Sequence, residues 1–125
     1  MTEHRIPYLD DEALAACMPV NPTFGQRLSG FARQQIACWT GLREAHLGLA
    51  QSLYRKMFLA DLEIQLQHNP FRIKSSTAKV DQASIQKRAC FLCPENLYPE
   101  QRALAYRGDW LILCNPFPIF PEHLV

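Results

Sequence analysis

Two cysteines with two residues between them, Cys90 and Cys93, have the spacing of one half of a zinc site. This spacing lets both thiolates approach one ion at about 2.3 Å from a single turn. Zinc prefers four ligands and no second close pair exists, so completion would depend on the fold bringing other side chains near. The candidates for that completion are His68, Cys114 and His123. The alternative is a tight turn with two reduced thiols, and the Pro94 that follows argues against a thioredoxin-like helix start.

A short basic segment rich in hydroxyl groups precedes this pair. It contains Arg72, Lys74, Ser75, Ser76 and Lys79. Such a segment can hold a phosphate group by charge and by backbone N–H groups, with Arg72 and Lys79 as the candidate contacts. The alternative is a solvated linker, which the residues alone favour.

Asn115 follows the apolar run 110–114 and precedes a turn that contains Pro116, Pro118 and Pro121. A carboxamide at this position can hydrogen-bond a ligand hydroxyl, or it can satisfy the backbone of its own turn. Considered by itself, the second role is the more common one.

The composition bounds the remaining possibilities. The chain has 125 residues, 48% of them hydrophobic and 20% charged, which is ordinary for one globular domain. A net charge of +1 gives no reason to expect binding to nucleic acid or to a membrane surface. Five cysteines with only one close pair suggest a reducing, cytoplasmic environment. No complete catalytic set is recognisable, and neither a nucleophile elbow nor a phosphate-binding glycine loop is present.

The patterns predict helices first and strands afterwards. Residues 1–20 form an arm with a short helix capped by Asp10 or Asp11, and a helix over 24–47 carries one apolar stripe. Strict alternation over 62–68 predicts a half-buried strand, paired with 55–59 across the turn Ala60-Asp61. Residues 69–89 are expected to be a polar loop with one helical turn capped by Asp81. The run 110–114 is apolar on both faces, as in a buried central strand.

Two of these motifs resemble the histidine-triad superfamily. Cys90-Phe-Leu-Cys93 is similar to the zinc-ligand pair of galactose-1-phosphate uridylyltransferases. The segment from Asn115 to His123 resembles the strand–turn–strand that precedes the catalytic motif in those enzymes, in dinucleoside-polyphosphate phosphorylases and in GDP-L-galactose phosphorylases. The resemblance covers roughly residues 62–125. The loop 69–81 and the cysteine pair that follows it also resemble an uncharacterised bacterial branch of these proteins.

This resemblance implies that Asn115 binds a nucleotide ribose, that His123 supports the site, and that Cys90 and Cys93 hold zinc. It implies a nucleotide-sugar or dinucleotide substrate and nucleotidyl transfer or phosphorolysis. The His-x-His-x-His or His-x-His-x-Gln segment that supplies the nucleophile in those enzymes is not found in this sequence. The chain by itself is therefore expected to be inactive.

The sequence therefore predicts an α+β fold, with N-terminal helices followed by part of an antiparallel sheet of histidine-triad type. Residues 1–20 would be an arm, and residues 21–125 a helix plus the N-terminal part of a truncated nucleotidyltransferase domain. The new strand that starts at Leu124 would leave an unfinished edge that favours self-association. The alternative function is a non-catalytic interaction module stabilised by zinc or by the thiol turn.

Overall fold

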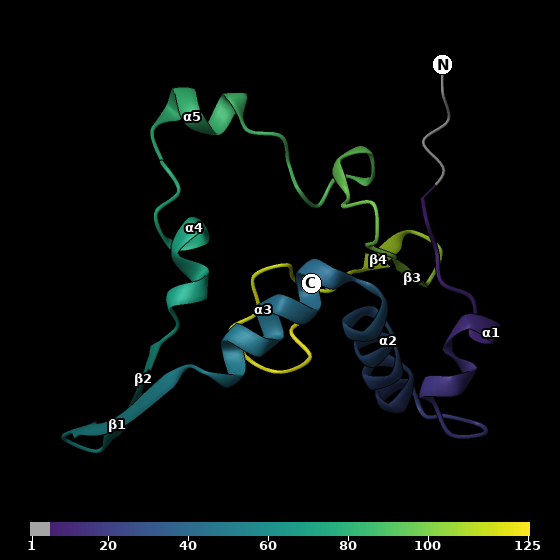
Figure 1. Ribbon diagram of the computed structural model, residues 1–125, viewed down its shortest axis with the longest axis horizontal. Helices are drawn as coiled ribbons and strands as arrows, with labels where there is room; N and C mark the ends of the chain where they lie inside the picture. Colours follow the sequence, from purple (N-terminus) through teal and green to yellow (C-terminus); the bar gives the residue numbers. More distant parts are fainter. Residues whose placement is uncertain (1–5) are drawn as a thin grey trace.

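The computed structural model describes residues 6–125, apart from the side chains of Lys74 and Ser75. Helices are followed by two antiparallel hairpins, which confirms the predicted α+β class. The helices are α1 (Asp11–Leu14), α2 (Phe24–Cys38), α3 (Thr40–Ala50), α4 (Ile73–Ser76) and α5 (Gln82–Lys87), with 3-10 turns η1 (Ala15–Cys17), η2 (Pro70–Arg72) and η3 (Pro94–Asn96). The strands are β1 (Leu53–Leu59), β2 (Leu62–His68), β3 (Leu104–Tyr106) and β4 (Trp110–Ile112) (Figure 1).

The N-terminal arm packs against the second hairpin. Asp10 caps α1, because its Oδ1 atom accepts a 2.8 Å hydrogen bond from the N–H of Ala13. Just before this cap, the N–H of Leu9 donates to the carbonyl of Ala103 at 2.9 Å. The predicted arm helix is confirmed over α1 and η1, while residues 1–5 lie outside the described part of the chain.

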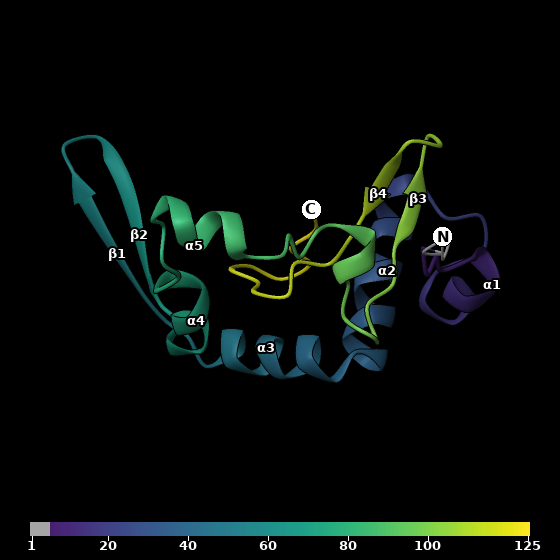
Figure 2. The same cartoon turned by 90° about the horizontal axis from the view of Figure 1, so that it is seen from above.

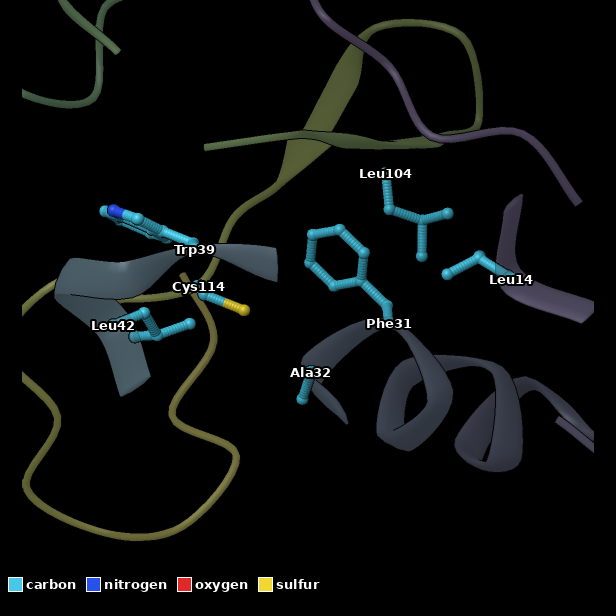
Figure 3. Packing of buried hydrophobic residues seen from close by; sticks show 7 residues of the cluster. All are labelled: Leu14, Phe31, Ala32, Trp39, Leu42, Leu104 and Cys114. Carbon is cyan, nitrogen blue, oxygen red and sulfur yellow. The ribbon is translucent and has the colours of Figure 1, made fainter. Parts of the chain in front are cut away.

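Helix α2 supplies the centre of the core. It begins with a capping box, in which Thr23 and Gln26 exchange side-chain-to-backbone hydrogen bonds. Phe31 on this helix is fully buried at the centre of the apolar cluster (Figure 3). The cluster consists of Leu14, Phe31, Ala32, Trp39, Leu42, Leu104 and Cys114. Residues from α1, α2, α3 and the second hairpin therefore share one core.

The predicted single helix over 24–47 is wrong, because the helix breaks at Trp39. The backbone of Trp39 is extended (φ −107°, ψ 105°), and its ring packs on Tyr98 with centroids 5.3 Å apart. Glu100 then takes the place of a local cap, since its carboxylate accepts hydrogen bonds from the N–H and hydroxyl of Thr40. In the described part of the chain, no helix is long and apolar enough to cross a membrane.

The first hairpin has the predicted strands and turn but not the predicted burial. β1 pairs with β2 from Leu53 opposite His68 to Leu59 opposite Leu62. The hairpin extends away from the core at one end of the molecule, while α1, β3 and β4 lie at the other end (Figure 2). Leu59 and Leu62 are 64% and 67% exposed, so the expectation of a half-buried strand is wrong.

Residues 69–89 contain η2 and α4 in addition to the one helical turn that was predicted for this loop. Asn69 caps η2 by accepting a 3.2 Å hydrogen bond from the N–H of Phe71. Asp81 caps α5 through the N–H and hydroxyl of Ser84, at 2.9 and 2.7 Å, which confirms the predicted helical turn. These hydrogen bonds stabilise the carboxylate and lower the pKa of Asp81.

The run 110–114 is not a central strand. β4 pairs with β3 alone among the described strands, and Trp110 is 67% exposed. Its continuation is buried: Leu113 exchanges two 2.9 Å backbone hydrogen bonds with Val125, and Cys114 forms a bridge with Leu124. The residues after the proline turn therefore return antiparallel to the end of this run, next to the core.

Candidate functional site

A cleft of about 560 Å³ brings together three residues that the sequence analysis selected from separate segments. They are Arg72 from η2, Cys90 from the cysteine turn, and Asn115 from the end of the run 110–114. The other lining residues are Ala78, Ile85, Arg88, Ala89, Phe91 and Phe117. This cleft is the candidate site.

Asn115 is held by the turn that it begins. Its backbone N–H donates to the carbonyl of His123 at 2.9 Å, and its Oδ1 atom accepts from the N–H of Phe117 at 2.8 Å. The turn role that the residues alone favour is therefore present. A carboxamide has two lone pairs and two N–H donors, so part of its hydrogen-bonding capacity remains for a ligand.

The proline turn itself is anchored to the body of the protein. Pro118 is fully buried, and Glu122 adopts a left-handed conformation with φ 55°. The carboxylate of Glu122 accepts a 2.8 Å hydrogen bond from the hydroxyl of Ser29 on α2. Because the turn is fixed by these contacts, Asn115 and His123 keep a defined separation.

The imidazole of His123 lies beside Asn115 and is biased toward its neutral form. Burial is the main cause of its lowered pKa, and the positive charge of Arg72 is the second. The Nδ1 atom lies 3.4 Å from the backbone nitrogen of Ile119, and Nε2 lies 3.5 Å from the amide nitrogen of Asn115. A neutral ring accepts at one nitrogen only, so only one of these two long contacts is a hydrogen bond at a time. Phe120 packs on the ring with centroids 4.3 Å apart.

Arg72 lies between the cleft and a second hollow of about 570 Å³ beside the hairpin. Tyr54, Gln67 and Phe120 line that second hollow. The Nε atom of Arg72 is shielded from solvent and has no hydrogen-bond partner within the described residues. A shielded guanidinium nitrogen without a partner favours an anionic ligand at this position.

Among the described side chains of the predicted basic segment, Arg72 alone lines the cleft. Lys79 is exposed between α4 and α5 and does not line it. Ser76 is exposed as well, and the side chains of Lys74 and Ser75 lie outside the described residues. Arg88 lines the cleft but was not selected from the sequence. The sequence feature that could have identified Arg88 is its positive charge two residues before Cys90, at the end of a predicted helical turn.

Cys90 and Cys93 lie on one turn, as predicted. The N–H of Cys93 donates to the carbonyl of Cys90 at 3.1 Å, and the amide of Asn96 donates to the same carbonyl at 2.9 Å. The pKa of Cys90 is lowered by hydrogen bonds from the backbone of Leu92 and from the thiol of Cys93. The pKa of Cys93 is raised, because its proton is shared with Cys90. Cys90 is therefore the residue of the pair that loses its thiol proton first.

The cysteine turn has two of the four ligands that a structural zinc site would need. Among the residues that the structure describes, no third His, Cys, Asp or Glu gathers with the pair. Cys114 is buried in the core, where burial raises its pKa to about 12. His123 belongs to the turn of Asn115, and His68 lies at the end of β2. The described fold therefore does not bring these three candidates close to the cysteine pair.

Comparison with known proteins identifies a protein family for this chain. No curated protein and no solved structure is significantly similar to the chain. Residues 31–125 match the family described as a domain of unknown function, DUF4922, and this match includes the cleft, the cysteine turn and the proline turn. The match spans more than half of the sequence, so the chain belongs to the DUF4922 family.

Proposed function

We propose that this chain provides the nucleotide-binding part of a nucleotidyltransferase or phosphorylase of histidine-triad type. The substrate would be a nucleoside-diphosphate sugar or a dinucleotide. The observation that supports this proposal is the convergence of Arg72 and Asn115 in one cleft, beside the neutral imidazole of His123.

Each residue has a distinct role in this proposal. The free hydrogen-bonding capacity of Asn115 suits the two hydroxyls of a ribose. Arg72 contacts phosphate directly, since a guanidinium presents two parallel donors to a phosphate group. Lys79 contributes only a positive charge at longer range, because it lies outside the cleft.

The chain alone is expected not to turn over nucleotides, because its sequence lacks the His-x-His-x-His or His-x-His-x-Gln segment. Zinc, if bound, would be held by Cys90 and Cys93 together with ligands from elsewhere, and it would stabilise the turn at the margin of the cleft. Phosphorolysis of nucleotide sugars by the purified chain, at a rate that survives repurification, would contradict the expected inactivity.

Nucleotide binding is tested by calorimetric titration of the chain with UDP, GDP and ADP. Asn115→Ala should weaken binding by roughly 1–3 kcal/mol, the usual loss for an unpaired polar group in a site. Asn115→Asp is the matched control, because a carboxylate keeps the oxygen that accepts from Phe117 and can accept from ribose hydroxyls. If Asn115→Ala unfolds the protein but leaves nucleotide affinity unchanged in the folded fraction, Asn115 acts only in the turn.

A second candidate function, a non-catalytic interaction module, is favoured by the hairpin. The register of β1 and β2 places six apolar side chains on one face, together with Arg55 and His68 at its margins. The other face carries Tyr54, Phe58 and polar side chains, including the 2.7 Å pair of Lys56 and Glu63. The six are Leu53, Met57, Leu59, Leu62, Ile64 and Leu66. All except Ile64 are more than two-fifths exposed, so this apolar face is largely open to solvent.

We propose a second copy of the chain as the partner of this apolar face. The unfinished edge at Leu124 that the sequence analysis considered is a weaker candidate, because Leu124 already pairs with Cys114. Sedimentation at increasing concentration should show association, which Leu62→Glu reduces. Gln65→Glu adds the same charge on the opposite face of β2 and is the control. Equal association in both variants would exclude the apolar face as the interface.

We also propose a cytoplasmic location. All five cysteines are free, as is usual in a reducing compartment. The net charge of +1 supports neither nucleic acid nor an anionic membrane surface as a partner. Fractionation of cells that express a tagged chain would test the location.

A further inference from the structure

Two arginines line the same cleft from separate segments of the chain. Arg72 is the last residue of η2, and Arg88 directly follows α5. Within residues 6–125, no aspartate or glutamate lines this cleft. The local charge is therefore positive, although the net charge of the whole chain is only +1.

Neither guanidinium is neutralised by a carboxylate within the described part of the protein. The ion pairs found there join Arg27 to Asp11 and Lys56 to Glu63, all outside the cleft. The shielded Nε atom of Arg72 has no hydrogen-bond partner there either. Two unpaired cations around one hollow repel each other, and a bound anion would remove this repulsion.

Both arginines are carried by short elements with fixed ends. Asn69 caps the turn that ends at Arg72, and Asp81 caps the helix that precedes Arg88. The N–H of Arg88 also closes the last turn of α5 on the carbonyl of Ile85 at 3.3 Å. The backbone that carries each arginine is therefore fixed at the cleft before any ligand binds.

We propose that Arg72 and Arg88 form an anion subsite for the diphosphate group of a nucleotide, with Arg88 as the specificity-determining second cation. This inference rests on the proposed function and adds a residue and a ligand group to it. A guanidinium contacts phosphate oxygens in a bidentate manner, and two of them match a diphosphate better than a single phosphate. Phe91 and Phe117 border the same cleft and reduce its solvent content, which strengthens the charge interaction.

The test is calorimetric titration of the chain with inorganic pyrophosphate at fixed ionic strength. Arg88→Gln should weaken pyrophosphate binding about tenfold, the size of one charge-assisted hydrogen bond. Lys87→Gln is the matched control, because it removes the same charge from the neighbouring position, which does not line the cleft. It should change the affinity by less than about twofold, because a charge outside the cleft makes no direct contact with the anion and is screened by salt. Arg88→Lys should retain part of the affinity, because it keeps the charge and loses the paired donors.

The outcomes separate this inference from the proposed function. Equal weakening by Arg88→Gln and Lys87→Gln, or no pyrophosphate binding by the original chain, overturns the anion subsite. Loss of pyrophosphate binding in Arg88→Gln alone supports it. If the three nucleoside diphosphates bind no better than pyrophosphate, and Asn115→Ala has no effect, the ribose role fails while the anion subsite stands.

Discussion

The backbone N–H of Asn115 donates a 2.9 Å hydrogen bond to the carbonyl of His123, and this bond closes the proline turn between them. The side chains of the same two residues approach to 3.5 Å. The backbone contact that shapes the turn therefore also sets the spacing of two polar groups beside the cleft. Changes at Asn115 should affect both the turn and the site, and they can be separated by the choice of substitution.

Asn115→Ala should lower the free energy of unfolding by about 1 kcal/mol, because it removes the acceptor for the N–H of Phe117. Asn115→Asp keeps an oxygen in the same place and should lower the free energy of unfolding by a smaller amount. Urea denaturation followed by tryptophan fluorescence measures both. An equal loss in the two variants would show that the Oδ1 contact does not stabilise the turn.

His123 should titrate below its ordinary pKa of 6.5 in the folded chain, because burial and the charge of Arg72 disfavour the imidazolium. The folded state then binds fewer protons than the unfolded state. The stabilising contribution of neutral His123 is complete above pH 6.5 and is lost as the pH falls through the lowered pKa.

The titration is followed through the imidazole Hε1 resonance. Arg72→Gln should raise the midpoint of His123, because it removes the nearby positive charge, while Lys79→Gln should leave it in place as the charge-matched control. A midpoint at or above 6.5 in the original chain, or the same midpoint in all three proteins, would contradict the assignment.

Cys90 should react with iodoacetamide at neutral pH before the other half of its pair. Its lowered pKa increases the thiolate fraction, whereas the pKa of Cys93 is raised. Cys114 should stay unmodified while the chain is folded, because it is buried and its pKa is about 12. Peptide mass spectrometry of timed samples gives the order in which the cysteines are modified. Modification of Cys93 ahead of Cys90 would contradict it, and Cys93→Ala, which removes the thiol that donates to Cys90, should slow the reaction of Cys90.

Gly48→Ala should destabilise the chain by about 1–3 kcal/mol, as overpacking usually does. A Cβ atom on Gly48 in α3 would overlap the Cβ and Cγ atoms of Phe71, which η2 places against the helix. The overlap involves the Cβ of Phe71, so rotation of the ring alone does not relieve it. The backbone next to Arg72 must then move, and anion binding should weaken as well.

Gly25→Ala is the control, because a Cβ at Gly25 in α2 meets nothing within 4 Å. This change should be neutral or stabilise the helix by up to about 1 kcal/mol. Thermal unfolding of the two variants measures the difference. A Gly48→Ala protein as stable as Gly25→Ala would show that the close approach of Phe71 is not needed for the fold.

Features that depend on neighbouring residues were predictable from the order of the amino acids. The alternation in 62–68 and the turn Ala60-Asp61 predicted the hairpin, and Asp10 and Asp81 predicted helix starts that the structure contains. The cysteine spacing predicted a single turn. Helix caps, turns and strand alternation depend on residues a few positions apart, so they can be predicted from the sequence.

The packing partners of those helices and strands depend on long-range contacts in the folded chain. The helix breaks at Trp39 because Tyr98 and Glu100, distant in the chain, offer a packing surface and a cap. The hairpin is exposed because the described part of the chain places no layer on its apolar face.

The site depends on the tertiary structure in the same way. Arg88, Arg72 and Asn115 line one cleft although they come from separate segments, and no sequence period relates these positions. Burial and proximity depend on long-range contacts, whose loop-closure cost and packing gain are properties of the whole fold, so local patterns do not encode them.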